Sequence, residues 1–304
     1  MEALLPVLKS HPGPAVLVCS LLFRVAHQLL QRLPVPTVVR QDAFRSWKWK
    51  NLSVSMVHSM LTGTWALTCV VIWPETLSNI HSFHTPLSYL LICVSTGYFV
   101  HDAGDIILTG HGRGSWEFLL HHAMVIWCFL YALYTQLYIA GALIALFVEV
   151  NSVTLHLRLM LKLANAQSSS IYHINKIANL FTYVMFRLGT QFYLTWYIVN
   201  NYSWMDHGGY FLVTMMMMNI MMVIYFYRLL RTDFFPRSKR YVGQNGTHNN
   251  NSKKILTFKK SEFQLCSQGA EQGKMWEERM NPGELSQQLL RSLSAAPLNF
   301  RGST

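Results

Sequence analysis

The chain has 304 residues, of which 51% are hydrophobic and only 13% are charged, and its formal net charge is +11. Soluble domains carry about 25% charged residues, so this composition excludes an ordinary soluble domain. The basic residues are spread over separate loops, which excludes a compact nucleic-acid-binding surface and favours anionic lipid head groups as their counterpart.

Seven apolar stretches, taken in chain order, predict an all-α polytopic transmembrane bundle. They cover residues 12–31, 52–73, 86–108, 116–136, 140–161, 177–199 and 209–230. A crossing needs ~20 apolar residues, and the 31 residues from 118 to 148 contain no Lys, Arg, Asp or Glu. That run is too long for one crossing, so we expect two helices that turn near residues 136–141.

The two ends of the chain differ from this pattern. Arg24 interrupts the first stretch, so residues 1–34 are expected to form either a membrane helix or a cleaved signal peptide, which would leave six crossings. Residues 35–235 are expected to form the transmembrane domain. Residues 236–304 are basic and lack a sustained helical period, which predicts a disordered tail.

Loop charge predicts the orientation of the bundle. Basic residues occur in segment 32–50, near residue 113, between Arg158 and Lys176, and after residue 228, whereas loops 74–85, 135–139 and 200–208 have no Lys or Arg. Basic loops remain cytoplasmic. We therefore expect the C-terminus to lie in the cytosol.

Titratable side chains lie inside the apolar stretches, where they are costly and suggest a function. At ~1.5 Å per helical residue, they fall in the cytoplasmic half and are expected to converge on one chamber. A carboxylate that orients an imidazole can form a general base, so Asp102, His121 and His122 are the candidate catalytic set. The candidate lipid-binding residues are His58, His101, Asp105, Glu149, Ser152 and His156.

Structural roles remain open for several of these residues. His58 and His156 also suit hydrogen-bonded packing positions. Glu149 and Arg187 fall near mid-membrane on successive helices, which predicts a structural ion pair. The chain has no His-x-x-x-His spacing and no cluster of Cys and His, so neither a metal site nor a cofactor is expected.

Three motifs in order along the helices resemble the TLC domain, which ceramide synthases and translocation-associated membrane proteins share. The resemblance covers roughly residues 35–235, and two cytosolic flanks, around residues 45–51 and 228–233, are similar to the branch of TLC-domain-containing proteins of types one and two (calfacilitin-like). The motif residues are Gly97, Tyr98, Phe99 and Asp102; Trp116, Glu117, His121 and His122; and Phe147, Glu149, Asn151 and Ser152.

One difference from ceramide synthases leaves open whether this protein is an enzyme. Ceramide synthases carry two aspartates, three residues apart, on the helix that here offers Glu149, Asn151 and Ser152.

The resemblance to the branch of types one and two implies a plasma-membrane protein, with the endoplasmic reticulum as the alternative location. It implies a regulator that limits polyunsaturated phospholipids and favours membrane rigidity. The alternatives are a lipid acyltransferase that uses acyl-CoA as substrate, and a non-catalytic accessory subunit of a calcium channel.

Overall fold

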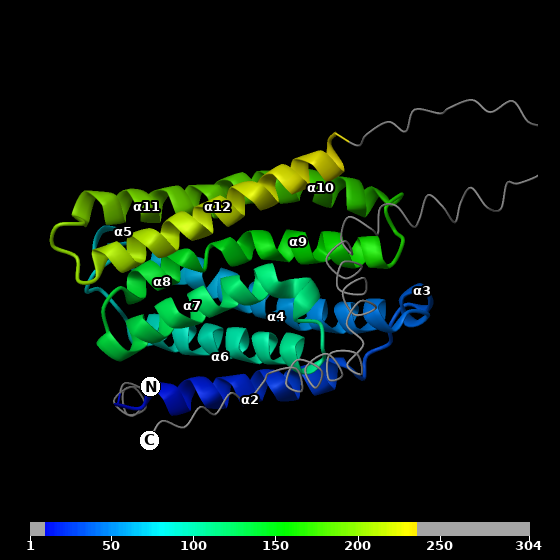
Figure 1. Ribbon diagram of the computed structural model, residues 1–304, viewed down its shortest axis with the longest axis horizontal. Coiled ribbons are helices and arrows are strands. Elements are labelled where there is room, and N and C mark those ends of the chain that lie inside the picture. The colour runs from blue at the N-terminus through cyan, green and yellow to red at the C-terminus, as the bar shows by residue number, and fades with distance from the viewer. Residues whose placement is uncertain (1–9, 236–304) are drawn as a thin grey trace, which may run out of the picture. The chain divides into compact units, whose positions relative to one another are not determined.

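The computed structural model describes residues 10–235, which form helices and no strand. The predicted tail, residues 236–304, lies outside the described residues, as do residues 1–9. The helices are α2 (Pro12–Leu30), α3 (Thr37–Arg40), α4 (Ala43–Ile72), α5 (Glu75–Ser78), α6 (Pro86–Leu108), α7 (Trp116–Thr135), α8 (Ile139–Ala145), α9 (Val148–Leu163), α10 (Ser170–Thr182), α11 (Gly189–Asn201) and α12 (Gly208–Asp233) (Figure 1). A 3₁₀ turn, η1 (Arg113–Ser115), precedes α7, and a π-helix, η2 (Tyr183–Leu188), joins α10 to α11.

Six helical segments are long and apolar enough to cross a membrane, which confirms the expected all-α polytopic architecture. They are α2, α4, α6, α7, the pair α8–α9, and α12. The sixth predicted stretch, 177–199, is not among them; it lies in α10, η2 and α11, which follow one another without a break. Because η2 divides this run into two α-helices of 13 residues, neither α-helix alone reaches the length of a crossing.

The described chain divides into two units. Residues 10–105 and 118–235 form the first, which we call the bundle, and all sites discussed below lie in it. The residues Ile106–Glu117 belong to the second and comprise the end of α6, η1 and the start of α7. In this segment, Nδ1 of His111 lies 3.0 Å from the hydroxyl of Thr109.

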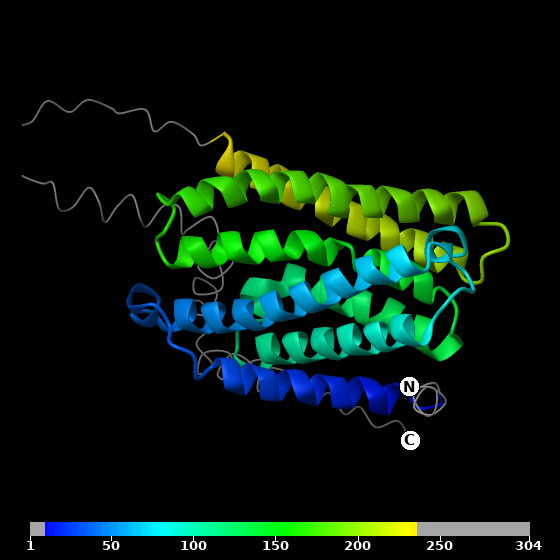
Figure 2. The ribbon, with the colours of Figure 1, turned by 180° about the vertical axis from the view of Figure 1, so that it is seen from behind.

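Successive helices of the bundle run back and forth between two ends. α3, the α9–α10 turn and the last residue of α12 lie at one end, which we call the α3 end; α5 and the α7–α8 turn lie at the other, the α5 end (Figure 1). α2 occupies one edge of the bundle and α10, α11 and α12 the opposite edge, as both views show (Figures 1 and 2). α4 packs on α9 between them.

Short-range signals position the helix ends. The side chain of Asp42 accepts from the backbone nitrogen of Arg45 at 3.1 Å and so caps α4. The turn expected near residues 136–141 occurs just after α7, with Gln136 at φ 57° and Tyr138 at φ 61°. The backbone nitrogen of Tyr138 donates to the carbonyl of His81 at 2.8 Å, which fixes this turn against the loop before α6.

A glycine allows α2 to pack tightly on α6. A Cβ atom at Gly97 would lie 2.5 Å from Cβ of Cys19 and 2.8 Å from the backbone nitrogen of Ser20. Beyond this contact, the ring of Phe23 on α2 lies edge-on to Tyr98 with centroids 5.3 Å apart. The close approach therefore makes α2 a packed member of the bundle.

We expect Gly97→Ala to lower the free energy of unfolding by about 1–3 kcal/mol, because the new methyl group overpacks the α2–α6 contact. Gly104→Ala is the matched control, since a Cβ there meets no atom within 4 Å, and it should leave the free energy of unfolding unchanged or raise it by up to about 1 kcal/mol, because alanine favours a helix over glycine. Thermal unfolding of both purified variants in detergent micelles measures the difference. Equal melting temperatures for the two variants would contradict the packing argument.

Candidate functional site

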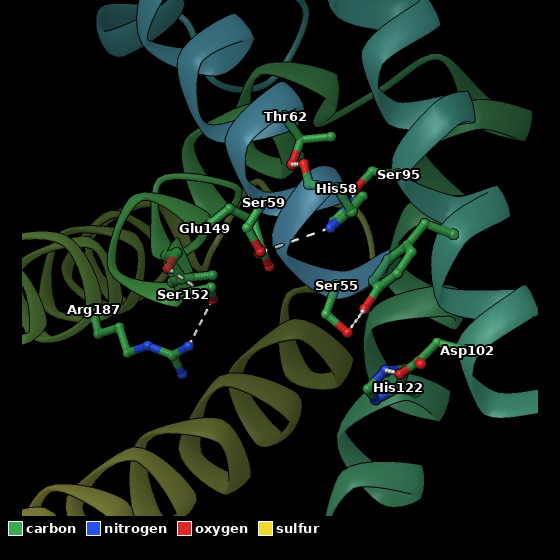
Figure 3. A network of polar contacts seen from close by, with 12 residues as sticks. Ser55, His58, Ser59, Thr62, Ser95, Asp102, His122, Glu149, Ser152 and Arg187 are labelled. Carbon is green, nitrogen blue, oxygen red and sulfur yellow. Dashed lines mark hydrogen bonds and ion pairs between the residues drawn. The ribbon is translucent and has the colours of Figure 1, made fainter. Parts of the chain in front are cut away.

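A chain of polar side chains runs through the bundle interior on α4, α6, α7 and α9 (Figure 3). Toward the α3 end, Asp102 of α6 lies between two partners. Nε2 of His122 on α7 lies 2.8 Å from Oδ2 of Asp102, and the amide of Asn51 on α4 donates to Oδ1 at 2.6 Å. Asp102 and His122 are only 6% and 7% exposed. One buried carboxylate thus ties three helices together.

The hydrogen bonds of His122 determine how many protons it shares with Asp102. Nδ1 of His122 lies 2.6 Å from the backbone carbonyl of Phe118, and a carbonyl only accepts, so Nδ1 carries a hydrogen. Nε2 faces the carboxylate, so either Nε2 also carries a hydrogen or Asp102 is protonated. In both cases, the pair holds one proton more than a neutral imidazole beside an ionised carboxylate. Both ring nitrogens of His122 are therefore occupied.

His121 differs from its neighbour. Its half-buried ring makes edge contacts with Phe99 and His122, at centroid distances of 6.5 and 5.7 Å. Within residues 10–235, its ring nitrogens have no hydrogen-bond partner. Of the two candidate imidazoles, His121 is therefore the one whose nitrogens remain available.

His58 and Glu149 meet further along α4 (Figure 3). The ring of His58 stacks on Tyr98 with centroids 3.7 Å apart, and its Nε2 lies 3.1 Å from the hydroxyl of Ser95. Its Nδ1 is 3.8 Å from Oε2 of Glu149 and lacks a hydrogen-bond partner in the described chain. Ser59 donates to the same Oε2 at 2.6 Å. A carboxylate of α9 is thus held beside a buried imidazole.

Arg187 of η2 lies at the other end of this chain of polar groups (Figure 3). Its Nε donates to Oδ1 of Asn151 at 2.6 Å, and its Nη2 donates to the hydroxyl of Ser152 at 2.9 Å. Its Nη1 lies 3.6 Å from the sulfur of Met222. All three partners are neutral. The guanidinium also acts electrostatically on the half-buried side chains of His121 and His156.

The structure does not form the predicted ion pair between Glu149 and Arg187. The ion pairs among the described residues do not include this one; Glu149 accepts from Ser59, and Arg187 donates to Asn151 and Ser152. Ser152 lies beside both charged groups, so a hydroxyl separates them. The physical reason is therefore competition from neutral hydrogen-bond partners on α4 and α9.

The remaining candidates fall into separate groups rather than into one chamber. His101 and Asp105 face α2: Nδ1 of His27 is 3.2 Å from Nε2 of His101 and 3.7 Å from Oδ1 of Asp105. The indole of Trp47 donates to Asp105 at 3.2 Å. Nδ1 of His156 is buried and has no hydrogen-bond partner within the part of the chain that the structure describes.

Sequence reasoning missed several partners. His27 lies in the first apolar stretch, three residues after Arg24, and that polar interruption was the available signal. Arg158, which the charge pattern places at a loop, is 5% exposed and forms an ion pair with Asp233 at the end of α12. Within residues 10–235, no group of three or more His, Cys, Asp or Glu side chains is arranged to hold a metal ion.

Comparison with known proteins identifies the family. The family model of the TLC domain matches residues 48–231. The chain belongs to the TLC domain family. It is 41% identical to human TLC domain-containing protein 1 over 227 residues, which are 74% of this chain and 92% of that protein. It is 38% identical to TLC domain-containing protein 2 of Danio rerio over 219 residues, 71% of this chain and 88% of that protein.

Family membership and the six candidate spans make this TLC domain protein a multi-pass membrane protein. The matched region contains α6, α7, α9 and η2, and therefore the Asp102–His122 pair and the Glu149–Arg187 region. Two acidic residues three apart, as in ceramide synthases, do not occur on α9, where Glu149 is followed by Asn151 and Ser152.

A double-mutant cycle tests the coupling of Asp102 and His122. We expect Asp102→Leu and His122→Leu each to lower the free energy of unfolding by about 3–5 kcal/mol, because each leaves a buried charge or polar group unpaired. The double variant should lose less free energy of unfolding than the two single variants lose together, with a coupling energy of about 1–3 kcal/mol. Denaturant unfolding in micelles gives these values. Strict additivity would show that the two side chains act independently.

Proposed function

We propose that this protein binds a polar lipid inside the membrane and regulates the acyl composition of membrane phospholipids. In this role, it limits polyunsaturated chains and favours rigidity. The observation that carries the proposal is the guanidinium of Arg187, which neutral side chains hold in the bundle close to the carboxylate of Glu149.

The energetics of buried charge support a ligand at this position. A charge at membrane depth is costly, so one that is present there indicates a function, and two opposite charges that pair directly offset part of that cost. Here Ser152 separates Arg187 from Glu149. Both charges therefore retain capacity for a polar lipid head group, with Arg187 facing an acidic moiety of the ligand.

We place this function at the plasma membrane with a cytosolic C-terminus. Basic residues just before α4, at the end of α9 and in the last two turns of α12 belong to the α3 end of the bundle in Figure 1; they are Arg40, Lys162, Arg228 and Arg231. Basic segments favour the cytoplasmic side of a membrane. Phospholipids, whose anionic head groups suit these segments, are the expected partners.

Lipid analysis of cells tests the proposal. Cells that lack the protein and are fed a polyunsaturated fatty acid should accumulate polyunsaturated phospholipids in the plasma-membrane fraction, and the wild-type protein should reverse this. Arg187→Gln should not, because loss of a charge-assisted contact of about 1.5–3 kcal/mol weakens lipid binding by about tenfold or more. Mass spectrometry of the phospholipid acyl chains is the measurement.

Thr64→Ala is the control for this experiment. The exposed Thr64 hydroxyl donates only within its own helix, to the carbonyl of Met60 at 2.7 Å and that of Leu61 at 3.1 Å. This variant should rescue as wild type does, at equal abundance in the plasma-membrane fraction. Acyl profiles that are the same with and without the protein would refute the proposed function.

A second candidate function is acyl transfer from acyl-CoA to a lipid acceptor. The free ring nitrogens of His121 favour it, because a general base needs an unoccupied nitrogen within reach of the acceptor hydroxyl or amine. His122 and Asp102 would then position α7 rather than accept the proton, because both already have partners.

Under this second function, the purified protein should transfer acyl groups from acyl-CoA to a lyso-phospholipid or amine acceptor. His121→Ala should reduce the rate by about 10²–10⁴-fold, the usual contribution of a general base. His121→Gln, which cannot act as a base, is the matched variant that preserves side-chain polarity. Background turnover that is equal in wild type and His121→Ala would exclude this reaction.

A further inference from the structure

A crevice of about 310 Å³ lies among α5, the α8–α9 break, η2 and the start of α11. None of the polar candidate residues lines it. Its apolar walls come from Leu77, Ile144, Phe147, Met185 and Phe186. Ligand pockets in proteins begin at about 300 Å³ and are mostly apolar, so this volume suits part of a ligand.

Two irregularities of the backbone create the crevice. α8 ends at Ala145 and α9 begins at Val148, so the fifth span is interrupted where Phe147 lines the wall. Facing it, the π-helical η2 contributes Met185 and Phe186. A π-helix is wider than an α-helix, and such insertions occur frequently at functional sites. The crevice therefore lies between a break in one candidate span and the π-helix that faces it.

The position of the crevice determines what can enter it. Ile144 and Phe147 in its wall belong to the candidate span Ile139–Leu163, whereas Leu77 lies on α5 between two candidate spans. We therefore place the crevice in the membrane, near the α5 end of the bundle. Met185 at its edge is 57% exposed, which places the opening on the apolar outer surface of the bundle. In this environment the available apolar molecules are lipid tails.

We propose that this crevice binds one fatty acyl chain of a phospholipid. The inference rests on the proposed function, because it names where the acyl chain of the bound lipid lies. Tyr193 fixes the walls: its hydroxyl donates to the carbonyl of Leu77 at 2.5 Å and so ties α11 to α5. A preformed crevice binds an acyl chain without the cost of ordering the protein. Its walls then favour those chains whose shape fits it.

Gly189 offers a way to close the crevice. Gly189 is one of its lining residues, and a Cβ atom there would meet only the carbonyl oxygen of Val184 at 3.7 Å, an ordinary contact. A Cβ at this position is therefore tolerated, and because Gly189 lines the crevice, we expect a leucine side chain there to occupy part of its volume. Gly104 on α6 is the matched control, because a Cβ there also meets nothing within 4 Å and the residue does not line the crevice.

The experiment uses the full chain in lipid nanodiscs that contain a phosphatidylcholine with a photoactivatable acyl chain. After illumination, mass spectrometry locates the labelled residues. We expect label on the residues around Phe147 and Phe186 that saturates as the probe fraction rises. Gly189→Leu should reduce this label by about tenfold, equivalent to ~1.4 kcal/mol of binding, Gly189→Ala by less, and Gly104→Leu not at all.

Three outcomes would overturn the inference. They are label that rises linearly with the probe in the wild-type protein, label spread evenly over the outer helices, and label at Phe147 and Phe186 unchanged in a folded Gly189→Leu variant. The first two need no variant, so they decide the question even where Gly189→Leu fails to fold. Saturable labelling together with unchanged acyl profiles in cells lacking the protein would preserve the crevice and refute the proposed function.

Discussion

A stripe of polar residues on α4 determines how the bundle interior is arranged. Hydrocarbon provides no hydrogen-bond partners, so each buried polar group must find one within the protein. The stripe therefore fixes the rotation of α4 against α6 and α9. α6 supplies Asp102, Ser95 and the hydroxyl of Tyr98, and α9 supplies Glu149. Four of the stripe residues, Asn51, Ser55, His58 and Thr62, recur every three or four positions, and Ser59 is the fifth member, next to His58.

Hydropathy predicts where helices cross, because burial in lipid depends on composition over about 20 residues. The predicted limits of the third stretch, 86–108, coincide with α6, and those of the first, fourth and last stretches differ from α2, α7 and α12 by no more than three residues. Hydropathy does not predict where the regular hydrogen-bond pattern of an α-helix is interrupted. The break at Leu146 and Phe147 and the π-helix at Tyr183–Leu188 were therefore not predictable from composition.

The same limit applies to the candidate site. Spacing predicts which residues share a face of one helix, and His101 and Asp105, four apart, do both approach His27. Spacing does not predict which neighbouring helix that face meets. For this reason, the sequence could not place α2 beside this pair, nor Ser152 between Glu149 and Arg187. Those contacts depend on how far each helix is rotated in the assembled bundle.

Hydrogen-bond partners distinguish the buried polar side chains that stabilise the bundle from those that remain available to a ligand. Asp102 and His122 are saturated, by Asn51, by the carbonyl of Phe118 and by each other, so they hold α4, α6 and α7 together. Arg187 has only neutral partners, although a carboxylate lies near it. A bundle optimised for stability alone would pair these two charges or replace both with apolar side chains, since a buried direct pair rarely improves on well-packed hydrophobic residues. Their retention in separated form is therefore the feature of the bundle that supports the proposed polar ligand.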